Sequence, residues 1–401
     1  MAAMILPDAA WRHRPGLDRL LAALDADAGE TRFVGGAVRD TLLGLPVADL
    51  DLATRLKPEL VRDRIREAGL KAVPTGLAHG TITAVLADGP VEVTTLRRDV
   101  STDGRRATVA FSDDWREDAA RRDFTINALY ADPANGAVID YFGGLDDLAA
   151  GRVRFIGDPL TRIAEDHLRI LRFFRFHARF GKGAPDAQGY DACAARAKDL
   201  MALSRERIAD ELLKILAGDD PAAVIRLMID REILASVLPE IGPDNARRLD
   251  ALVAAEAAAA VAPDRIRRFI ALVPADPAAA DDIAARLRLS NAIRKRIAFV
   301  LSGMPAGTPA AMGYRIGREA AIDRLLLAGE TAGAASLRNW DKPTLPTSGG
   351  ALVARGLTAG PAVARALRAI EERWIAEGFP GRERVDAIVD AELLQAFNPR
   401  Q

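Results

Sequence analysis

The chain has 401 residues, a formal net charge of −1 and 49% hydrophobic residues. At roughly 100–200 residues per domain, this length predicts several domains with sizeable cores, and the composition excludes a disordered or collagen-like protein. The single cysteine, Cys193, excludes an intrachain disulfide and a cysteine-based zinc site, and it favours a reducing, cytoplasmic location. We expect no membrane span, because no apolar run reaches roughly 18 residues. A nucleic-acid partner must be sought in local basic patches, since the total charge is close to zero.

Two regimes of hydrophobic patterning divide the chain. Short apolar or alternating runs bounded by Gly, Pro or Asp predict strands over residues 31–34, 50–53, 80–86, 91–96 and 138–141. Short helices are predicted between them, over residues 37–43 and 58–68. From about residue 160 the apolar period becomes helical, which predicts helices over residues 168–180, 205–216, 222–227, 247–260, 281–287, 292–301 and 362–376. The predicted fold class is α+β, with a mixed head followed by an all-α remainder.

The first candidate site follows the strand at residues 31–34. Gly35 and Gly36 separate this strand from a helix, so backbone N–H groups can approach a phosphate that the helix N-terminus also favours. Arg39, early in that helix, is placed to reach the same anion. Asp49 and Asp51 stand two residues apart on a predicted strand, so both carboxylates point to one face and can bind one or two Mg²⁺ ions. Each motif alone more often marks a tight turn or a solvated strand, but together they indicate a phosphate and metal site.

The segment RFVGGAVRDTLLGLPVADLDLAT, residues 32–54, resembles the head of class II tRNA nucleotidyltransferases, the CCA-adding enzymes, and of their relatives the bacterial poly(A) polymerases. The order, spacing and identity of its residues all agree with that family. The resemblance implies a DNA polymerase β-like nucleotidyltransferase head with a small mixed sheet over residues 1–150. It further implies a helical neck over 151–218 that reads the nucleotide base, and a helical body and tail over 219–401 that bind tRNA.

Two further motifs extend this candidate site. The strand at residues 91–96 places Glu92 as a third acidic group near Asp49 and Asp51. The octapeptide RRDFTINA, residues 121–128, resembles a motif of the same family, and its Arg122 is expected to bind the triphosphate because a guanidinium fork binds two oxygens at once. Its Asp123 and Asn127 stand four residues apart and are expected to share a helical face.

Residues 165–180, EDHLRILRFFRFHARF, are predicted to form one helix. At about 100° per residue, four arginines fall on one face with Asp166 at its edge, and the apolar residues fall on the other face. These arginines are Arg169, Arg172, Arg175 and Arg179. The resemblance of this segment to the family motif EDxxR implies that Asp166 and Arg169 read the incoming base. It also implies that Arg172 and Arg175 hold the triphosphate.

A basic segment, RLRLSNAIRKRI, spans residues 286–297 and contains no acidic residue. We expect a helix–turn–helix here, in which Arg294, Lys295 and Arg296 contact phosphates of a nucleic acid. An ordinary solvated helix face is an equally weighted interpretation of the same charges.

These patterns predict an enzyme, a Mg²⁺-dependent nucleotidyltransferase in which Asp49 and Asp51 bind the metal. A primer 3′-OH attacks the α-phosphate in line and pyrophosphate leaves, so no protein nucleophile is needed. By resemblance, the primer is the 3′ end of tRNA, the nucleotides are CTP and ATP, and the product is CCA. Two alternatives stay open at this point. One is a poly(A) polymerase or an enzyme that adds only A or CC, and the other is a catalytically dead nucleotide-binding module, which intact Asp49, Asp51 and Arg122 argue against.

Overall fold

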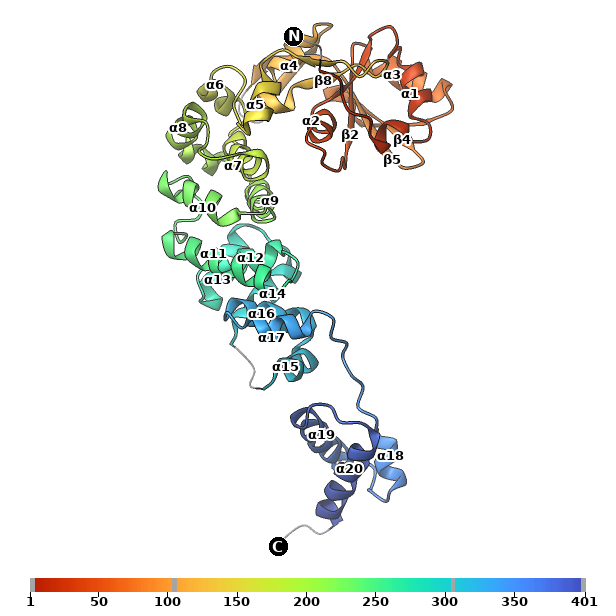
Figure 1. The fold of residues 1–401 in the computed structure, drawn as a ribbon, viewed down its shortest axis with the longest axis vertical. Coiled ribbons are helices and arrows are strands. Elements are labelled where there is room, and N and C mark those ends of the chain that lie inside the picture. The colour runs from red at the N-terminus through yellow and green to blue at the C-terminus, as the bar shows by residue number, and fades with distance from the viewer. Residues whose placement is uncertain (1–3, 103–106, 304–306, 398–401) are drawn as a thin grey trace. The chain divides into compact units, whose positions relative to one another are not determined.

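The computed structural model describes residues 4–102, 107–303 and 307–397, drawn as ribbons in Figure 1. They form two compact units. The first runs to Asp219 and includes Val224–Pro239, and the second takes Asp220–Ala223 and the chain from Glu240 onward. The predicted division of the first unit into a head and a neck near residue 150 stays a prediction. No described helix combines the length and the apolar character that a membrane crossing requires.

A mixed seven-stranded sheet forms the framework of the first unit, with the strand order β3-β4-β5-β2-β1-β8-β9. Within this sheet the pair β2–β5 is parallel and the other neighbouring pairs are antiparallel. The strands are β1 (Thr31–Val34), β2 (Leu50–Thr54), β3 (Lys71–Gly76), β4 (Thr81–Leu86), β5 (Gly89–Thr95), β8 (Leu129–Ala131) and β9 (Val138–Asp140). A separate hairpin contains β6 (Arg97–Thr102) and β7 (Ala107–Phe111).

The five predicted strands are all present, which confirms the α+β class, but four more strands were missed. The edge strand β3 has no buried residue, so it shows no apolar alternation in the sequence. The helices of this part are α1 (Leu17–Ala23), α2 (Gly36–Leu42), α3 (Pro58–Glu67), α4 (Trp115–Ala120) and α5 (Gly144–Ala150). Helix α2 packs against β1, β2 and β8, and α3 packs against β3, β4 and β5 (Figure 1). This packing fixes the glycine turn before α2 beside the start of β2.

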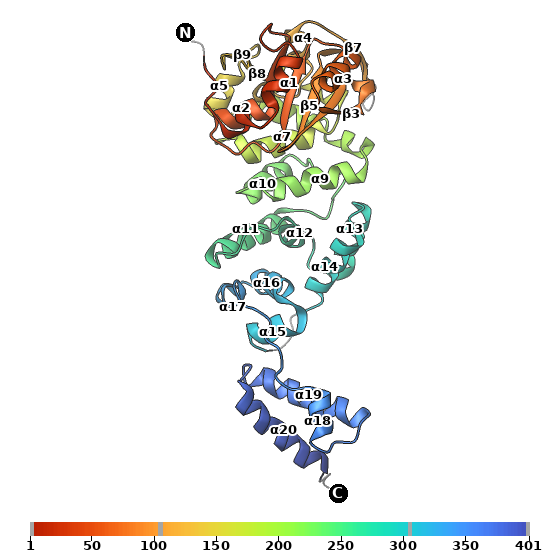
Figure 2. The same ribbon diagram turned by 90° about the vertical axis from the view of Figure 1, so that its right-hand side faces the viewer.

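The rest of the first unit is helical. Its helices are α6 (Pro159–Glu165), α7 (Arg169–Phe180), α8 (Ala187–Ala195) and α9 (Arg205–Leu216), and α10 (Pro221–Asp230) lies at the division between the units. Helix α7 buries Ile170, Phe173 and Phe174 and packs against α9, which lies beside it in Figure 2. Burial of one apolar face leaves the arginine face of α7 available to a ligand.

The prediction of one continuous helix over residues 165–180 is wrong. Helix α6 ends at Glu165, Asp166 is extended with φ −149°, and α7 begins at Arg169. The Asp166 carboxylate accepts the backbone N–H of Leu168 at 3.1 Å, which is the local competition with helical hydrogen bonding that Asp residues offer. Asp166 therefore stands just before α7 and not on its acidic edge.

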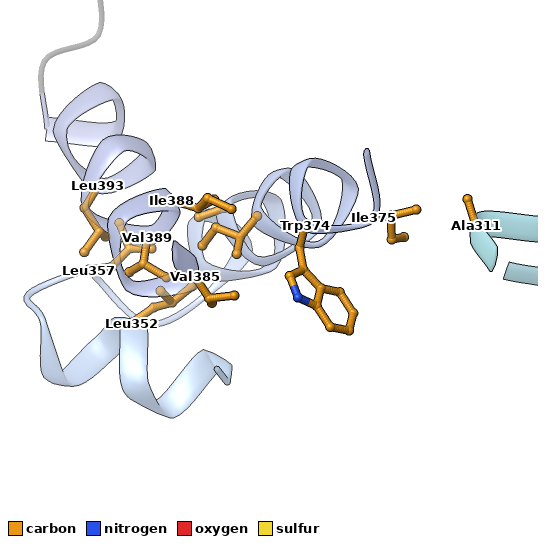
Figure 3. Close-up of a cluster of buried hydrophobic side chains, with 11 residues drawn as sticks. Ala311, Leu352, Leu357, Trp374, Ile375, Val385, Ile388, Val389 and Leu393 are labelled. Atoms are coloured by element: carbon orange, nitrogen blue, oxygen red, sulfur yellow. The ribbon is translucent and has the colours of Figure 1, made fainter. Parts of the chain in front are cut away.

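The described part of the second unit is built of helices. They are α11 (Pro243–Ala258), α12 (Arg265–Leu272), α13 (Pro277–Arg286), α14 (Asn291–Leu301), α15 (Pro309–Ile316), α16 (Arg318–Leu327), α17 (Thr331–Leu337), α18 (Gly349–Ala354), α19 (Pro361–Ala376) and α20 (Arg382–Phe397). A loop rich in Pro and Gly joins α17 to α18. The last three helices share a hydrophobic core, to which α18 contributes Leu352, α19 contributes the buried Trp374 and α20 contributes Ile388 (Figure 3).

Candidate active site

A cavity of the first unit has a volume of ≈ 1070 Å³ and is lined by α2, β2, the RRDFTINA segment, α7 and α9. Its basic lining residues are Arg39, Arg121, Arg122, Arg169, Arg172, Arg175, Arg179 and Lys214, and its acidic ones are Asp40, Asp49, Asp51, Asp123, Asp166 and Asp219. The excess of basic residues suits an anionic ligand, and the volume is sufficient for a nucleoside triphosphate. Of the residues predicted for the head and neck site, all but Glu92 line this cavity.

The glycine turn forms one wall of the cavity. Gly35 has φ 70°, a conformation that favours glycine, and a Cβ atom placed on it would lie 3.3 Å from Nη1 of Arg122. Helix α2 begins at the next residue, Gly36, one position earlier than predicted. A side chain at position 35 would therefore fill the space between the turn and Arg122.

The acidic group lies on the neighbouring strands β2 and β5. Asp49 is exposed just before β2, Asp51 is partly buried within it, and Glu92 of β5 stands directly beside Asp51 in the parallel register. Burial raises the pKa of Asp51 to about 6, and the negative charges of Glu92 and Asp49 add to the increase, while Arg122 opposes it. Negative charge therefore accumulates around one carboxylate, and a bound cation would relieve it.

Asp118 of α4 holds two arginines of the cavity lining, and the sequence analysis missed it. It is buried and pairs with Arg121 at 2.8 Å and with Arg122 at 3.2 Å, and it accepts the hydroxyl hydrogen of Tyr130 at 2.7 Å. Burial alone would raise the pKa of Asp118, but the two arginines lower it to about 2. The spacing of Asp118 from the two arginines, three and four residues, was the available signal. Asp118 thus fixes the arginine pair at the cavity.

Asp123 links the RRDFTINA segment to α7. Its carboxylate accepts Nε of Arg172 at 2.7 Å and Nδ2 of Asn127 at 3.0 Å. Asp123 and Asn127 therefore meet as expected, although Asn127 ends a short 3₁₀ helix (Thr125–Asn127) and does not share an α-helix with Asp123. Arg39 also lines the cavity, but it is buried, donates to Asn127 and pairs with Asp40. Its contacts therefore hold this wall of the cavity in place.

The two residues predicted to read the base, Asp166 and Arg169, contact different partners. The Asp166 carboxylate accepts Nη2 of Arg207 on α9, at 3.2 Å and 3.1 Å from its two oxygens. Arg169 pairs with Glu165 at 2.6 Å and donates to the backbone oxygen of Arg121 at 3.2 Å. Arg207 was not predicted, because nothing in its local sequence connects it with a residue 41 positions earlier.

The remaining arginines of α7 also have acidic partners at the cavity wall. Arg175 pairs with Glu211 of α9 at 2.8 Å, and Arg179 pairs with Asp40 of α2 at 3.1 Å. All four predicted arginines of the basic face line the cavity. Their ion pairs hold the side chains in place across neighbouring elements, which orders the face before a ligand arrives.

The predicted basic cluster lies in the second unit, on α14. Arg294 pairs with Asp281 at 2.7 Å, and Arg296 pairs with Asp323 at 2.7 Å and with Asp264 at 3.0 Å. Lys295 is exposed. These acidic partners all come from outside residues 286–297, so the local sequence gave no sign of them. Two of the three cations therefore already form ion pairs within the unit. RNA contact by this cluster stays a prediction, and it now concerns mainly Lys295.

Comparison with known proteins adds independent evidence. Residues 31–154 match the model of the poly(A) polymerase head domain, and residues 186–244 match the model of the probable RNA- and SrmB-binding site of polymerase A. The chain is 34% identical over 386 residues to the mitochondrial CCA tRNA nucleotidyltransferase 1 of Mus musculus, and the aligned region covers 91% of this chain and 87% of the relative. It is 38% identical over 218 residues to the CCA-adding enzyme of Lacticaseibacillus paracasei, covering 54% of this chain and 53% of that one.

A solved structure is also similar. The crystal structure of the Bacillus stearothermophilus CCA-adding enzyme in complex with CTP matches with a TM-score of 0.70 and 26% identity, covering 96% of this chain and 100% of that chain. The motifs at residues 32–54 and 121–128 lie inside the matched head domain, and the mouse relative aligns over nearly the whole chain. The chain therefore belongs to the family of class II tRNA nucleotidyltransferases and bacterial poly(A) polymerases.

Proposed function

We propose that this protein adds CMP and AMP to the 3′ end of tRNA, completing or repairing the CCA sequence from CTP and ATP without a nucleic-acid template. The observation that carries the proposal is a single cavity in which an acidic pair, Asp49 and Asp51, faces a wall of arginines. This is the donor set for transfer from a nucleoside triphosphate. Near full-length similarity to a CCA tRNA nucleotidyltransferase supports tRNA as the acceptor.

The residues around Asp51 fit a divalent cation. The carboxylates of Asp49 and Asp51, at the start of β2, supply hard oxygen ligands, and the raised pKa of Asp51 reflects negative charge that a cation would compensate. Within the described ranges no group of three or more His, Cys, Asp and Glu side chains forms a metal cage, so water and phosphate oxygens would complete the coordination. Bound there, Mg²⁺ supplies activation of the primer hydroxyl and charge compensation on the triphosphate. Glu92, beside Asp51, increases the negative potential of the site.

The arginines position the triphosphate. Arg122, held by Asp118, lies next to the glycine turn, and Arg172 and Arg175 extend the positive wall along α7. Guanidinium forks bind pairs of phosphate oxygens and stabilise the charge that develops on the leaving pyrophosphate. Orientation of the α-phosphate toward the primer hydroxyl is the principal contribution that such a rigid wall makes to the rate.

Asp166 and Arg169 choose the base. C and A both present an exocyclic amine beside a ring nitrogen acceptor, so a carboxylate accepts from the first and a guanidinium donates to the second. U and G present a carbonyl beside an N–H, which would leave unpaired groups against both side chains. Arg207 donates to both oxygens of Asp166 and the backbone N–H of Leu168 also donates to Oδ1, so Oδ2 keeps a lone pair for the amine of the base. Arg207 thereby orients the carboxylate.

The test is a matrix of acceptors and nucleotides. The protein is incubated with tRNAs that end before CCA, after C and after CC, with CTP and ATP supplied singly and together. We expect C, C and A to be added in order and addition to stop after A. Addition of A alone or of CC alone would identify a partial enzyme, and a long A tract would identify a poly(A) polymerase. Nucleotide binding without any transfer would identify a non-catalytic module, and each of these results would refute the proposal.

The cytoplasmic location inferred from the single cysteine remains part of this proposal. The mouse relative is named as a mitochondrial protein. Fractionation of cells that express the chain with a small C-terminal tag tests the assignment, and recovery with mitochondria would refute it.

A further inference from the structure

A second cavity, of ≈ 400 Å³, lies within the second unit among α11, α12, α14 and α16. Its wall is largely aliphatic and includes Leu252, Val300 and Leu326. Two arginines also line it, Arg248 from α11 and Arg324 from α16, and these helices pack against each other. None of the described lining residues is acidic. The cavity therefore combines an apolar wall with positive charge alone.

Arg324 is buried, with 7% of its surface exposed. It donates to the backbone oxygen of Phe299 and to Oγ of Ser302 at 3.0 Å, and its guanidinium lies 4.5 Å from the centre of the Phe299 ring. Its Nε atom is buried without a hydrogen-bond partner among the described residues. Buried donors are nearly always paired, so an unpaired one beside a cavity indicates a missing acceptor.

Arg248 is half-buried and donates to the backbone oxygen of Val273 at 2.8 Å. In the described part of the chain, neither Arg248 nor Arg324 has a carboxylate partner, and burial lowers the pKa of both. By contrast, the buried Arg267 and Arg268 of the same unit both pair with Glu256. Two uncompensated guanidinium groups at one apolar cavity are costly without an anion.

We propose that this cavity binds one nucleotide through its phosphate, with Arg248 and Arg324 on the phosphate oxygens and the aliphatic wall against the sugar or base. The volume falls in the range of small-ligand pockets, about 300–1,000 Å³. Arginine forks match the geometry of phosphate and carboxylate oxygens alike, and the aliphatic wall beside them suits the sugar or base that a nucleotide phosphate carries. The nucleotide comes either from solution or from an RNA chain, and the RNA source rests on the proposed function.

The test has two arms and one matched control. Arg247 precedes Arg248 on α11, is mostly exposed and pairs with Asp244, so Arg247→Gln removes the same charge away from the cavity. In the first arm, equilibrium dialysis measures binding of radiolabelled AMP and CMP in EDTA to wild type, Arg248→Gln, Arg248→Lys and Arg247→Gln. In the second arm, filter binding measures the affinity of tRNA lacking CCA over a range of salt concentrations for the same four proteins.

We expect Arg248→Gln to weaken binding about tenfold in at least one arm, Arg248→Lys to retain part of the affinity, and Arg247→Gln to behave as wild type. A loss of mononucleotide binding identifies a free nucleotide as the ligand. A loss confined to tRNA, with a salt slope lower by about one, identifies an RNA phosphate. Equal affinities for wild type and Arg248→Gln in both arms, or equal losses for Arg247→Gln and Arg248→Gln, would overturn the proposal.

CCA addition by wild type is assayed in parallel, which separates this proposal from the proposed function. If wild type adds CCA while Arg248→Gln binds both ligands normally, only the inference about the second cavity fails. If wild type adds no nucleotide, the proposed function fails, and the dialysis arm still decides whether the cavity binds a nucleotide.

Discussion

Replacement of Asp51 by Asn should stabilise the metal-free protein while it abolishes transfer. Burial and the charges of Glu92 and Asp49 raise the pKa of this carboxyl from 3.8 to about 6. A raised carboxyl pKa means that the folded state prefers the protonated form. Ionisation of Asp51 therefore lowers the free energy of unfolding as the pH rises from about 4 to about 6, and this decrease is complete above that range.

The expected size of the effect follows from the shift. At about 1.4 kcal/mol per pKa unit, two units correspond to nearly 3 kcal/mol. Partial solvent exposure of Asp51 screens this value, so we expect Asp51→Asn to raise the free energy of unfolding by about 1–2 kcal/mol above pH 7. The gain should shrink as the pH falls and become small near pH 4, where the carboxyl is protonated in the folded state and close to half protonated in the unfolded state.

Urea unfolding in EDTA, at several pH values between about 4 and 8, measures this difference. Asp88→Asn is the control, because Asp88 is exposed between β4 and β5. Added Mg²⁺ should stabilise wild type and leave Asp51→Asn nearly unchanged. A variant that is less stable than wild type above pH 7, or a difference that does not depend on pH, would refute the account of charge accumulation at Asp51.

Three further predictions concern the supports of the site. Asp118→Asn should lower the free energy of unfolding by about 2 kcal/mol at pH 7 and by much less near pH 2. The reason is that a carboxyl pKa held at about 2 in the folded state gives stability that is lost as the pH falls below about 4. An equal loss at both pH values in urea unfolding would contradict this. Asp166→Ala should raise misincorporation of UTP and GTP relative to CTP by more than it lowers turnover, measured by single-nucleotide extension, and an equal loss with all four nucleotides would mean that the base is read elsewhere. Gly181→Ala should destabilise the first unit by about 1–3 kcal/mol in thermal unfolding, because the new Cβ would collide with the His177 ring and lie 2.6 Å from its backbone oxygen; an unchanged melting temperature would show that α7 ends more loosely than described.

Local patterns were sufficient for much of the fold. Strand β1 and helix α9 were predicted to the residue, because β1 ends at the glycine turn and α9 follows Ser204 and buries one apolar face. The edge strand β3 has no buried face, so its sequence shows no apolar pattern from which a strand could be predicted. The break before α7 was missed because Asp166 interrupts the backbone hydrogen bonds without disturbing the apolar period on either side.

The candidate site was predictable as a set of residues but not as a set of contacts. The glycine turn, the acidic pair and the arginines were all recognisable from motifs, and the structure brings them to one cavity. The partners that hold them come from distant segments, as Arg207 does for Asp166 and Asp323 for Arg296. A segment without acids, such as residues 286–297, can therefore look like a free basic patch when its charges are already paired in the fold.

The most direct test of the central claim is the rate at which one AMP is transferred from ATP to a tRNA that ends in CC. The rate is compared for wild type, Asp49→Ala and Asp51→Ala, with Asp88→Ala as an exposed carboxylate control from the same sheet. We predict a loss on the order of 10³-fold for each of the first two variants, in proteins whose folding is intact, and no change for the control. If both variants keep more than about a tenth of the wild-type rate, a loss of only ~1.4 kcal/mol, then Asp49 and Asp51 do not form the catalytic centre.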